Sequence, residues 1–425
     1  MPGVDTFAAV EIETEEEPRL LAAAEPELPF RILVLGDFTG GVGRNRAVIE
    51  IDRDRFNEVL ALFSPEARVA ICEEPLAIRF RALEDFHPDR LFDSLAPFAA
   101  LRDLRRRLSD PATFASAAAQ IAPARATVPA SEWDRMLREM VEPYAAPRAA
   151  PRQAELIAQA EAAMSGHMCA ILHHPAFRAI EAAWRGVHFL VRRLETGRRL
   201  RIYVLDVGKE ELLSGAGLAA LRYELSAEDW AVVAGLYEFA PPDEPALLRI
   251  ASLARAARAP FLAGLAPEAA GVAGIFSELR LAADAPSIGL ASPRFLLRLP
   301  YGSEADQTAS FAFEEMPSPP EHKRYLWGNP AIACAFLLGD AFTRYGWNLN
   351  PGASQTIEGL PLHVSKIDGV PEPTPCAEVL LTEDAAEALL DRGFIPLASI
   401  KGTGSIRVVR FQSVANPSTP LAGRW

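Results

Sequence analysis

Apolar runs of strand length alternate with helical patterns along most of this chain, and this alternation restricts the possible folds more than any other feature. Residues 30–35 form a nearly continuous apolar run, and residues 76–82 alternate apolar with polar side chains. Between them, Phe56, Leu60 and Phe63 recur at helical spacing. Strands that alternate with helices are typical of mixed α/β domains, so these residues predict a compact first α/β unit.

The alternation returns in the second half of the chain. After Pro175, the apolar residues Phe177, Ile180, Trp184 and Val187 lie three or four positions apart, which predicts a helix with one broad apolar face. The other predicted elements are helices at 91–108, 245–259, Pro330–Tyr345 and 383–392, and strands at 200–207, 231–239, 360–366, 377–381 and 406–414. We therefore expect an α/β fold, in the mixed α+β sense, with two units that each pack helices on a mixed sheet.

Composition suggests where these units begin and end. A chain of 425 residues, half of them apolar, can bury a substantial core and is too long for one ordinary domain. Val10 and Ile12 alternate with glutamates, which predicts a strand on an N-terminal arm. Ala and Pro dominate a later stretch that has few large aliphatic residues and reads as a linker. The predicted parts are an arm at 1–27, a domain at 28–120, a linker at 121–154 and a domain at 155–425.

Charge and cysteine content exclude several classes of protein. The chain has 43 Lys and Arg against 56 Asp and Glu, a net charge of -13, which argues against a nucleic-acid binder. Its four cysteines lie far apart, which favours reduced thiols over a disulfide framework or a zinc ribbon. No secretory signal opens the sequence, and no apolar run approaches the roughly 20 residues that span a bilayer. We therefore expect a cytoplasmic protein without membrane insertion.

Three groups of residues could carry catalysis or ligand binding, and each has a simpler interpretation. The glycine-rich loop at 36–43 lacks both the GK[ST] ending and the G-x-G-x-x-G spacing of phosphate-binding loops, so a plain turn is favoured. The pair Glu314 and Glu315, with Asp306 nearby, lies in a Pro- and Ser-rich stretch that reads as a solvated loop.

The third group holds the ligand types that a metal prefers but has no recognised metal-binding spacing: His167, Cys169, His173 and His174. Pro175 directly after the histidine pair favours a helix break at which the imidazoles form local hydrogen bonds. There is also no Gly-x-Ser-x-Gly motif. We predict no catalytic residue, no metal and no cofactor, hence a protein that is not an enzyme.

Several sequence blocks resemble a known family. Residues 28–41, reading LPFRILVLGDFTGG, together with 51–54 and 80–86, resemble the small subunit of the type VI secretion contractile sheath. Residues 171–191, reading ILHHPAFRAIEAAWRGVHFLV, resemble the large subunit of the same sheath. Shorter blocks follow in the order of the large subunit: 237–239, 299–302, 325–329, 344–347, 358–361, 393–397 and 412–414. The chain is thus identified as a natural fusion of two sheath-type units.

The resemblance implies a structural role. Sheath subunits of this family polymerise in the bacterial cytoplasm around an inner tube, and their contraction drives effector delivery by this phage-tail-like injection machine. The implied partners are other copies of the chain or other sheath subunits, the inner-tube protein and the baseplate. One alternative is a sheath-derived adaptor or cap at the sheath end or baseplate that forms no long polymer. An alternative from another class is a nucleotide-dependent enzyme or hydrolase that uses the loop at 36–43.

The resemblance also assigns roles to residues. Terminal strands are exchanged between protomers in this family, and the candidates for exchange are Val10, Ile12, Ile406, Val408, Phe411 and Val414. Arg407 and Arg410 fit a strand at a sheet edge, where charge discourages unwanted pairing. The family blocks contribute the aromatic residues Trp184, Tyr301, Trp327 and Trp347, which are expected to anchor the core. The linker replaces most of the N-terminal region of the large subunit, where the recycling unfoldase of the family binds.

Overall fold

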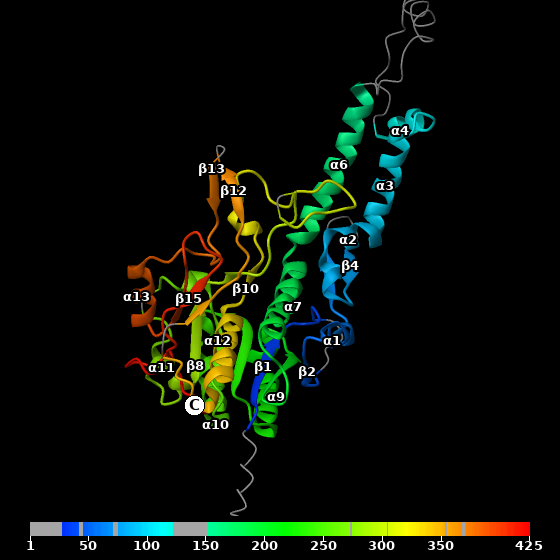
Figure 1. Cartoon of the computed structure of the whole chain (residues 1–425). Coiled ribbons are helices and arrows are strands. Elements are labelled where there is room, and N and C mark those ends of the chain that lie inside the picture. The colour runs from blue at the N-terminus through cyan, green and yellow to red at the C-terminus, as the bar shows by residue number, and fades with distance from the viewer. Residues whose placement is uncertain are drawn as a thin grey trace, which may run out of the picture.

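One sheet of nine strands combines segments from both halves of the chain (Figure 1). The computed structural model describes residues 28–41, 46–70, 75–121, 151–272, 274–303, 305–352, 355–367 and 370–425. Within these ranges the strand order in the sheet is β11-β15-β14-β8-β7-β6-β1-β5-β2. The strands are β1 (Phe30–Gly36), β2 (Ile49–Ile51), β5 (Leu200–Asp206), β6 (Val232–Phe239), β7 (Phe261–Leu265), β8 (Ile288–Ser292), β11 (Gln355–Ile357), β14 (Ile395–Ser399) and β15 (Ile406–Val408).

Strand β1 lies inside this sheet, between β5 and β6, and is parallel to both. All seven of its residues pair with β5, from Phe30 with Leu200 to Gly36 with Asp206. A continuous apolar run suits this position because a parallel strand between two helical layers is buried on both faces. The first unit expected from the sequence is therefore not self-contained, since its first strand belongs to the sheet of the second.

Helices cover both faces of the sheet (Figure 1). On one face lie α7 (Pro175–Arg193) and α12 (Pro330–Tyr345), and on the other lie α9 (Gly215–Ala227) and α10 (Glu244–Ala257). Alternate side chains of β1 enter the two cores: Val34 packs with the α7 and α12 side, and Leu33 with the α9 and α10 side.

The rest of the N-terminal segment packs against α7. Its elements are α1 (Phe56–Phe63), β3 (Glu66–Val69), β4 (Leu76–Arg79), the 3-10 turn η1 (Leu83–Phe86) and α2 (Pro88–Ser94). The fully buried Trp184 of α7 contacts the rings of Phe38, Phe56 and Phe63 at centroid distances of 5.2, 5.9 and 5.5 Å. Its indole nitrogen donates a hydrogen bond to the carbonyl oxygen of Phe38 at 3.0 Å. Trp184 therefore joins the two family-like parts of the chain.

Three helices extend away from the sheet: α3 (Ala96–Ser109), α4 (Phe114–Ile121) and α6 (Pro151–Leu172) (Figure 1). They share a small apolar cluster that includes Leu108, Leu156 and Ala160. The single helix expected at 91–108 is instead two helices, α2 and α3. In one continuous helix the ring of Pro97 would clash with the backbone carbonyl four residues earlier, so the helix is interrupted before Pro97. Residues 122–150 lie outside the described ranges, so the limits of the linker stay a prediction.

Other elements complete the C-terminal part. They are α8 (Lys209–Leu213), α11 (Ser277–Leu281), α13 (Glu383–Asp391), and the strands β9 (Phe295–Leu296), β10 (Trp327–Gly328), β12 (Val364–Ile367) and β13 (Val370–Pro373). Among the described residues, strands β12 and β13 pair only with each other. The strand expected at 377–381 is reduced to one isolated bridge between Phe295 and Ala377.

The C-terminal strand differs from the expectation in length and in position. It ends at Val408, and it pairs with β14 on one side and β11 on the other, so the predicted edge strand is an interior strand. The edge position was predicted from the charges of Arg407 and Arg410. Those charges carry no information about β11, the second neighbour of this strand, because β11 lies about fifty residues earlier in the sequence. Ile406, Val408, Phe411 and Val414 are each at most 1% exposed. Val10 and Ile12 lie outside the described residues.

Candidate functional site

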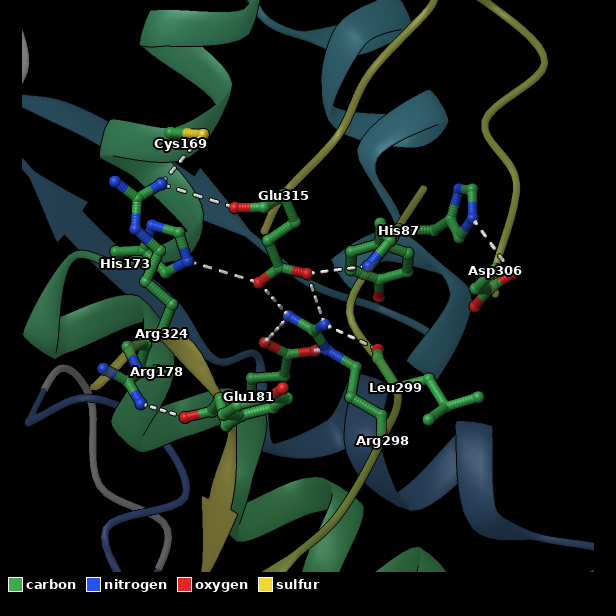
Figure 2. Close-up of polar contacts among 12 residues, drawn as sticks. His87, Cys169, His173, Arg178, Glu181, Arg298, Leu299, Asp306, Glu315 and Arg324 are labelled. Carbon is green, nitrogen blue, oxygen red and sulfur yellow. Dashed lines mark hydrogen bonds and ion pairs between the residues drawn. The ribbon is translucent and has the colours of Figure 1, made fainter. Parts of the chain in front are cut away.

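A buried ionic cluster ties α7 to two segments of the C-terminal part (Figure 2). At its centre Arg298 lies between the carboxylates of Glu181 and Glu315. Arg298 donates through Nε to Glu181 Oε1 at 2.8 Å and through Nη1 to Glu315 Oε2 at 2.7 Å. Exposed fractions of 8%, 0% and 1% for these side chains show that water does not screen the pairs.

A second layer of contacts surrounds this centre. Arg185, one turn after Glu181 on α7, donates to Glu181 Oε1 at 2.7 Å and to the Tyr301 hydroxyl oxygen at 2.9 Å. The backbone N–H of Tyr301 donates to Glu315 Oε2 at 2.8 Å, and His173 Nε2 lies 3.4 Å from the other oxygen of Glu315. Two guanidinium groups thus balance two carboxylates inside the protein.

The surroundings keep Glu315 charged and Tyr301 neutral. Burial by itself would raise the pKa of Glu315, but Arg298, the nearby His173 and the hydrogen bond from Tyr301 N outweigh it and lower this pKa to about 2. Burial raises the pKa of the Tyr301 phenol to about 12, so Tyr301 keeps its proton. Every charged group of the cluster faces an opposite charge within the protein. The arrangement is suited to fixing segments in place and not to proton transfer.

The cluster also reaches the N-terminal segment. The His87 ring packs edge-on against Tyr301 with centroids 4.9 Å apart. Asp89, at the start of α2, accepts hydrogen bonds from the backbone N–H groups of Ala309 and Ser310 at 3.0 and 2.9 Å. The N-terminal segment is therefore held at two places, at Trp184 and beside this cluster.

Comparison with protein families identifies the two parts of the chain that contact each other at Trp184 and beside the ionic cluster. Residues 21–122 match the model described as "Type VI secretion system, VipA, VC_A0107 or Hcp2". Residues 154–277 and 274–415 match the VipB model, described as "EvpB/VC_A0108, tail sheath N-terminal domain", over more than half of the chain. The chain belongs to the type VI secretion tail sheath family.

A curated relative agrees with this assignment. The sheath chain is 31% identical over 307 residues to "Type VI secretion system sheath protein TssC1" of Pseudomonas aeruginosa. The match covers 62% of the sheath chain and 61% of the relative, so the chain spans less than two thirds of the relative's length. The resemblance to both sheath subunits is confirmed, and so is the mixed α/β fold.

The glycine-rich loop of the sheath chain is organised around carboxylates. Asp37 accepts hydrogen bonds from the N–H groups of Gly40 and Gly41 at 2.9 and 3.0 Å. The buried Asp206 accepts from Phe38 N and from the Thr39 hydroxyl, both at 2.7 Å. The N–H groups that would bind a phosphate already bind negative side chains, so the described part of this loop gives a nucleotide no site.

Three of the four residues raised as metal-ligand types have separate partners. His174 Nδ1 accepts from Ala176 N at 3.3 Å and caps α7, and His173 faces Glu315. Cys169 Sγ lies 4.0 Å from a nitrogen of Arg324. In the ranges that the structure describes, no group of three or more His, Cys, Asp or Glu side chains could hold a metal ion. In the same ranges, no helix combines the length and apolar content needed to cross a membrane.

The expectation of a solvated loop at Glu314 and Glu315 is wrong for Glu315, which is 1% exposed. Composition around Glu315 is that of a loop, and only the distant partners Arg298 and Glu181 explain its burial. One signal was available in the sequence: Glu181 lies four residues after Phe177 and three before Trp184, on the predicted apolar face of its helix. A charge at such a position requires a buried partner.

The aromatic residues of the family blocks lie in or against the core. Trp184, Tyr301 and Trp327 are buried, with exposed fractions of 0%, 1% and 6%. Trp347 is partly buried and packs on the rings of Phe30 and Phe342 at 5.6 and 5.2 Å. Its indole nitrogen donates to the Leu28 carbonyl oxygen at 2.8 Å, which holds the start of β1.

Proposed function

We propose that this chain is a structural subunit of the type VI secretion contractile sheath. It polymerises in the cytoplasm around the inner tube and stores the energy for contraction and effector delivery. The observation that carries the proposal is that one chain supplies both sheath-type parts and joins them through β1 in a single sheet. The work is mechanical and needs no catalysis, because a modest free-energy difference per protomer between two packings sums over many protomers.

Two free sheet edges support assembly by strand addition. In the described residues the sheet ends at β2 on one side and at β11 on the other. An extended segment from a neighbour can pair with such an edge through main-chain hydrogen bonds. We propose that the N-terminal arm, with Val10 and Ile12, is the segment that a protomer donates.

The C-terminal candidates for exchange take a different part in this proposal. Ile406 and Val408 belong to β15, which pairs with β11 from the inner side, so they hold the proposed acceptor strand in place. Phe411 and Val414 are buried in the core of the same protomer. The acceptor edge is then β11, through the main-chain groups of Gln355, Thr356 and Ile357.

Negative-stain electron microscopy of the purified chain, alone and mixed with the inner-tube protein of the same gene cluster, tests the proposal. Hollow tubes or rings are expected, and a chain that lacks residues 1–14 should stay folded and form neither. Small uniform particles in both wild-type samples would contradict the proposal. They would favour an adaptor or cap that binds the sheath end or the baseplate.

A further inference from the structure

The sheet has a topological switch point between β1 and β6. The chain leaves β1 towards β5 through α7 on one face, and then returns from β5 to the other side of β1 through α9 on the opposite face. Connections that diverge in this way leave a crevice outside the carboxyl ends of the two strands, and open α/β sheets bind ligands there. The ionic cluster described above does not use this crevice.

A pocket of about 460 Å³ occupies the crevice, a volume typical of sites for small ligands. On the α7 side its wall is built from the small residues Ala179, Ala182 and Ala183, with Ile332 of α12 beside them. On the sheet side β6 has a bulge: Ala234 pairs with Leu262 but Glu238 pairs with Gly264, so β6 has two extra residues. Bulges of this kind redirect side chains and are common beside binding sites.

The cations that line the pocket are already neutralised. Lys209 Nζ donates to Asp243 Oδ2 and to the Glu238 carbonyl oxygen, both at 2.7 Å. Arg294 Nε donates to Glu378 Oε2 at 2.7 Å, and its Nη2 bonds the other oxygen of that carboxylate. A phosphate or carboxylate ligand would have to displace these partners, which argues against an anion.

The carboxylate of Glu238 is less well compensated. Its nearest cation is Arg294, whose Nη1 lies 3.3 Å from Glu238 Oε1 while the same guanidinium bonds Glu378. The Glu238 side chain is 31% exposed at the pocket, and burial raises its pKa although Arg294 acts in the opposite direction. The pocket therefore combines an apolar wall with an acidic end.

We propose that this pocket binds a cationic group on a short apolar stem, an alkylammonium or alkylguanidinium. The cation would pair with Glu238, and the stem would lie along the alanines of α7 and Ile332. The group could belong to a free small molecule or to a Lys or Arg side chain of a second copy of this chain. Both have the same chemistry at the pocket.

Calorimetry and ligand-observed NMR on the full chain test this proposal with butylguanidinium and pentylamine as probes. Pentanoate and pentanol serve as the anionic and neutral matches. We expect saturable binding of the two cations only. Glu238→Gln should raise their Kd about tenfold or more, the loss expected for a hydrogen bond to a charged group. Ala182→Leu, which fills the pocket without changing its charge, should also weaken binding.

The control is Glu58→Gln, because Glu58 on α1 is a glutamate with a 75% exposed side chain outside the pocket. It should leave the Kd unchanged. Inhibition of assembly by excess butylguanidinium would assign the cation to a neighbouring copy, and unchanged assembly would assign it to a free small molecule. The proposal is overturned if neither cation binds saturably, or if pentanoate binds as tightly as the cations. It is also overturned if the Glu238→Gln variant binds the cations with the wild-type Kd while its urea midpoint equals that of the wild type.

Discussion

Single residues matter most in this protein where charge is buried. Glu181, Arg298 and Glu315 come from three separate segments, and each is buried against a side chain of opposite charge from another segment. Such a cluster adds little net stability over apolar packing, but loss of one member leaves an uncompensated charge in the interior. The loss of folding free energy on replacing a charged residue is therefore set by how deeply that residue is buried and not by its type.

Glu315→Ala should destabilise the fold by about 3–5 kcal/mol, because Arg298 then shares the single carboxylate of Glu181 with Arg185. The matched control is the adjacent Glu314→Ala, since Glu314 is exposed and accepts one hydrogen bond from Ser303 N. That change should cost less than about 1 kcal/mol. Urea unfolding followed by circular dichroism measures both, and equal losses would show that the cluster has no special role.

His188 gives a pH dependence with a defined sign. Burial, assisted by Arg185, lowers its pKa from 6.5 to about 4, and its ring packs edge-on against Phe56. Below about pH 6.5 the unfolded chain binds a proton that the folded chain does not, so stability is complete above that pH and falls towards pH 4. His188→Gln should flatten this slope. The urea midpoints of both chains between pH 7 and 5 measure it, and parallel slopes would contradict the assignment.

At the scale of elements, the C-terminal segment serves the protomer's own fold. If this segment were exchanged between protomers, a chain truncated after Gly404 would still fold, but the burial of the segment within its own protomer argues against that outcome. The segment carries Ile406, Val408 and Phe411 into one core and Val414 into the other. Burial of four such side chains contributes on the order of 10 kcal/mol, which is comparable with the whole stability of a domain.

A chain that ends at Gly404 should therefore fail to fold cooperatively, whereas a chain that lacks residues 1–14 should keep the wild-type urea midpoint. Circular dichroism and size-exclusion chromatography of the two truncations make the comparison. A monomeric, cooperatively unfolding product from the C-terminal truncation would restore the view that this strand is free for exchange.

At the scale of the whole molecule, the two sheath-type parts share one sheet. Strand β1 fills the position between β5 and β6, and neither neighbour has another partner on that side. Trp184 and Asp89 add contacts between the parts at two further places. We therefore expect the linker between α4 and α6 to keep the two sheath-type parts in a one-to-one ratio and to contribute little to the stability of the protomer.

Co-expressed fragments 1–121 and 151–425 should bind each other and copurify as a one-to-one complex. Fragment 151–425 expressed alone should aggregate, because the absence of β1 exposes the edges of β5 and β6. Copurification through a tag on one fragment and light scattering measure this. A soluble, cooperatively folded fragment 151–425 would show that the C-terminal part completes its sheet without β1.

The sequence by itself determined the alternation of strands and helices, the apolar face of α7 and the two sheath-type parts, because local periodicity and ordered motifs carry that information. Pro330–Tyr345 was predicted with the limits that the structure gives. Only the tertiary structure decided that β1 is an interior strand, that β15 is paired on both sides and that Glu315 is buried. Each of these depends on partners far away in the sequence, and a local pattern does not show which distant segment supplies a hydrogen bond or an opposite charge.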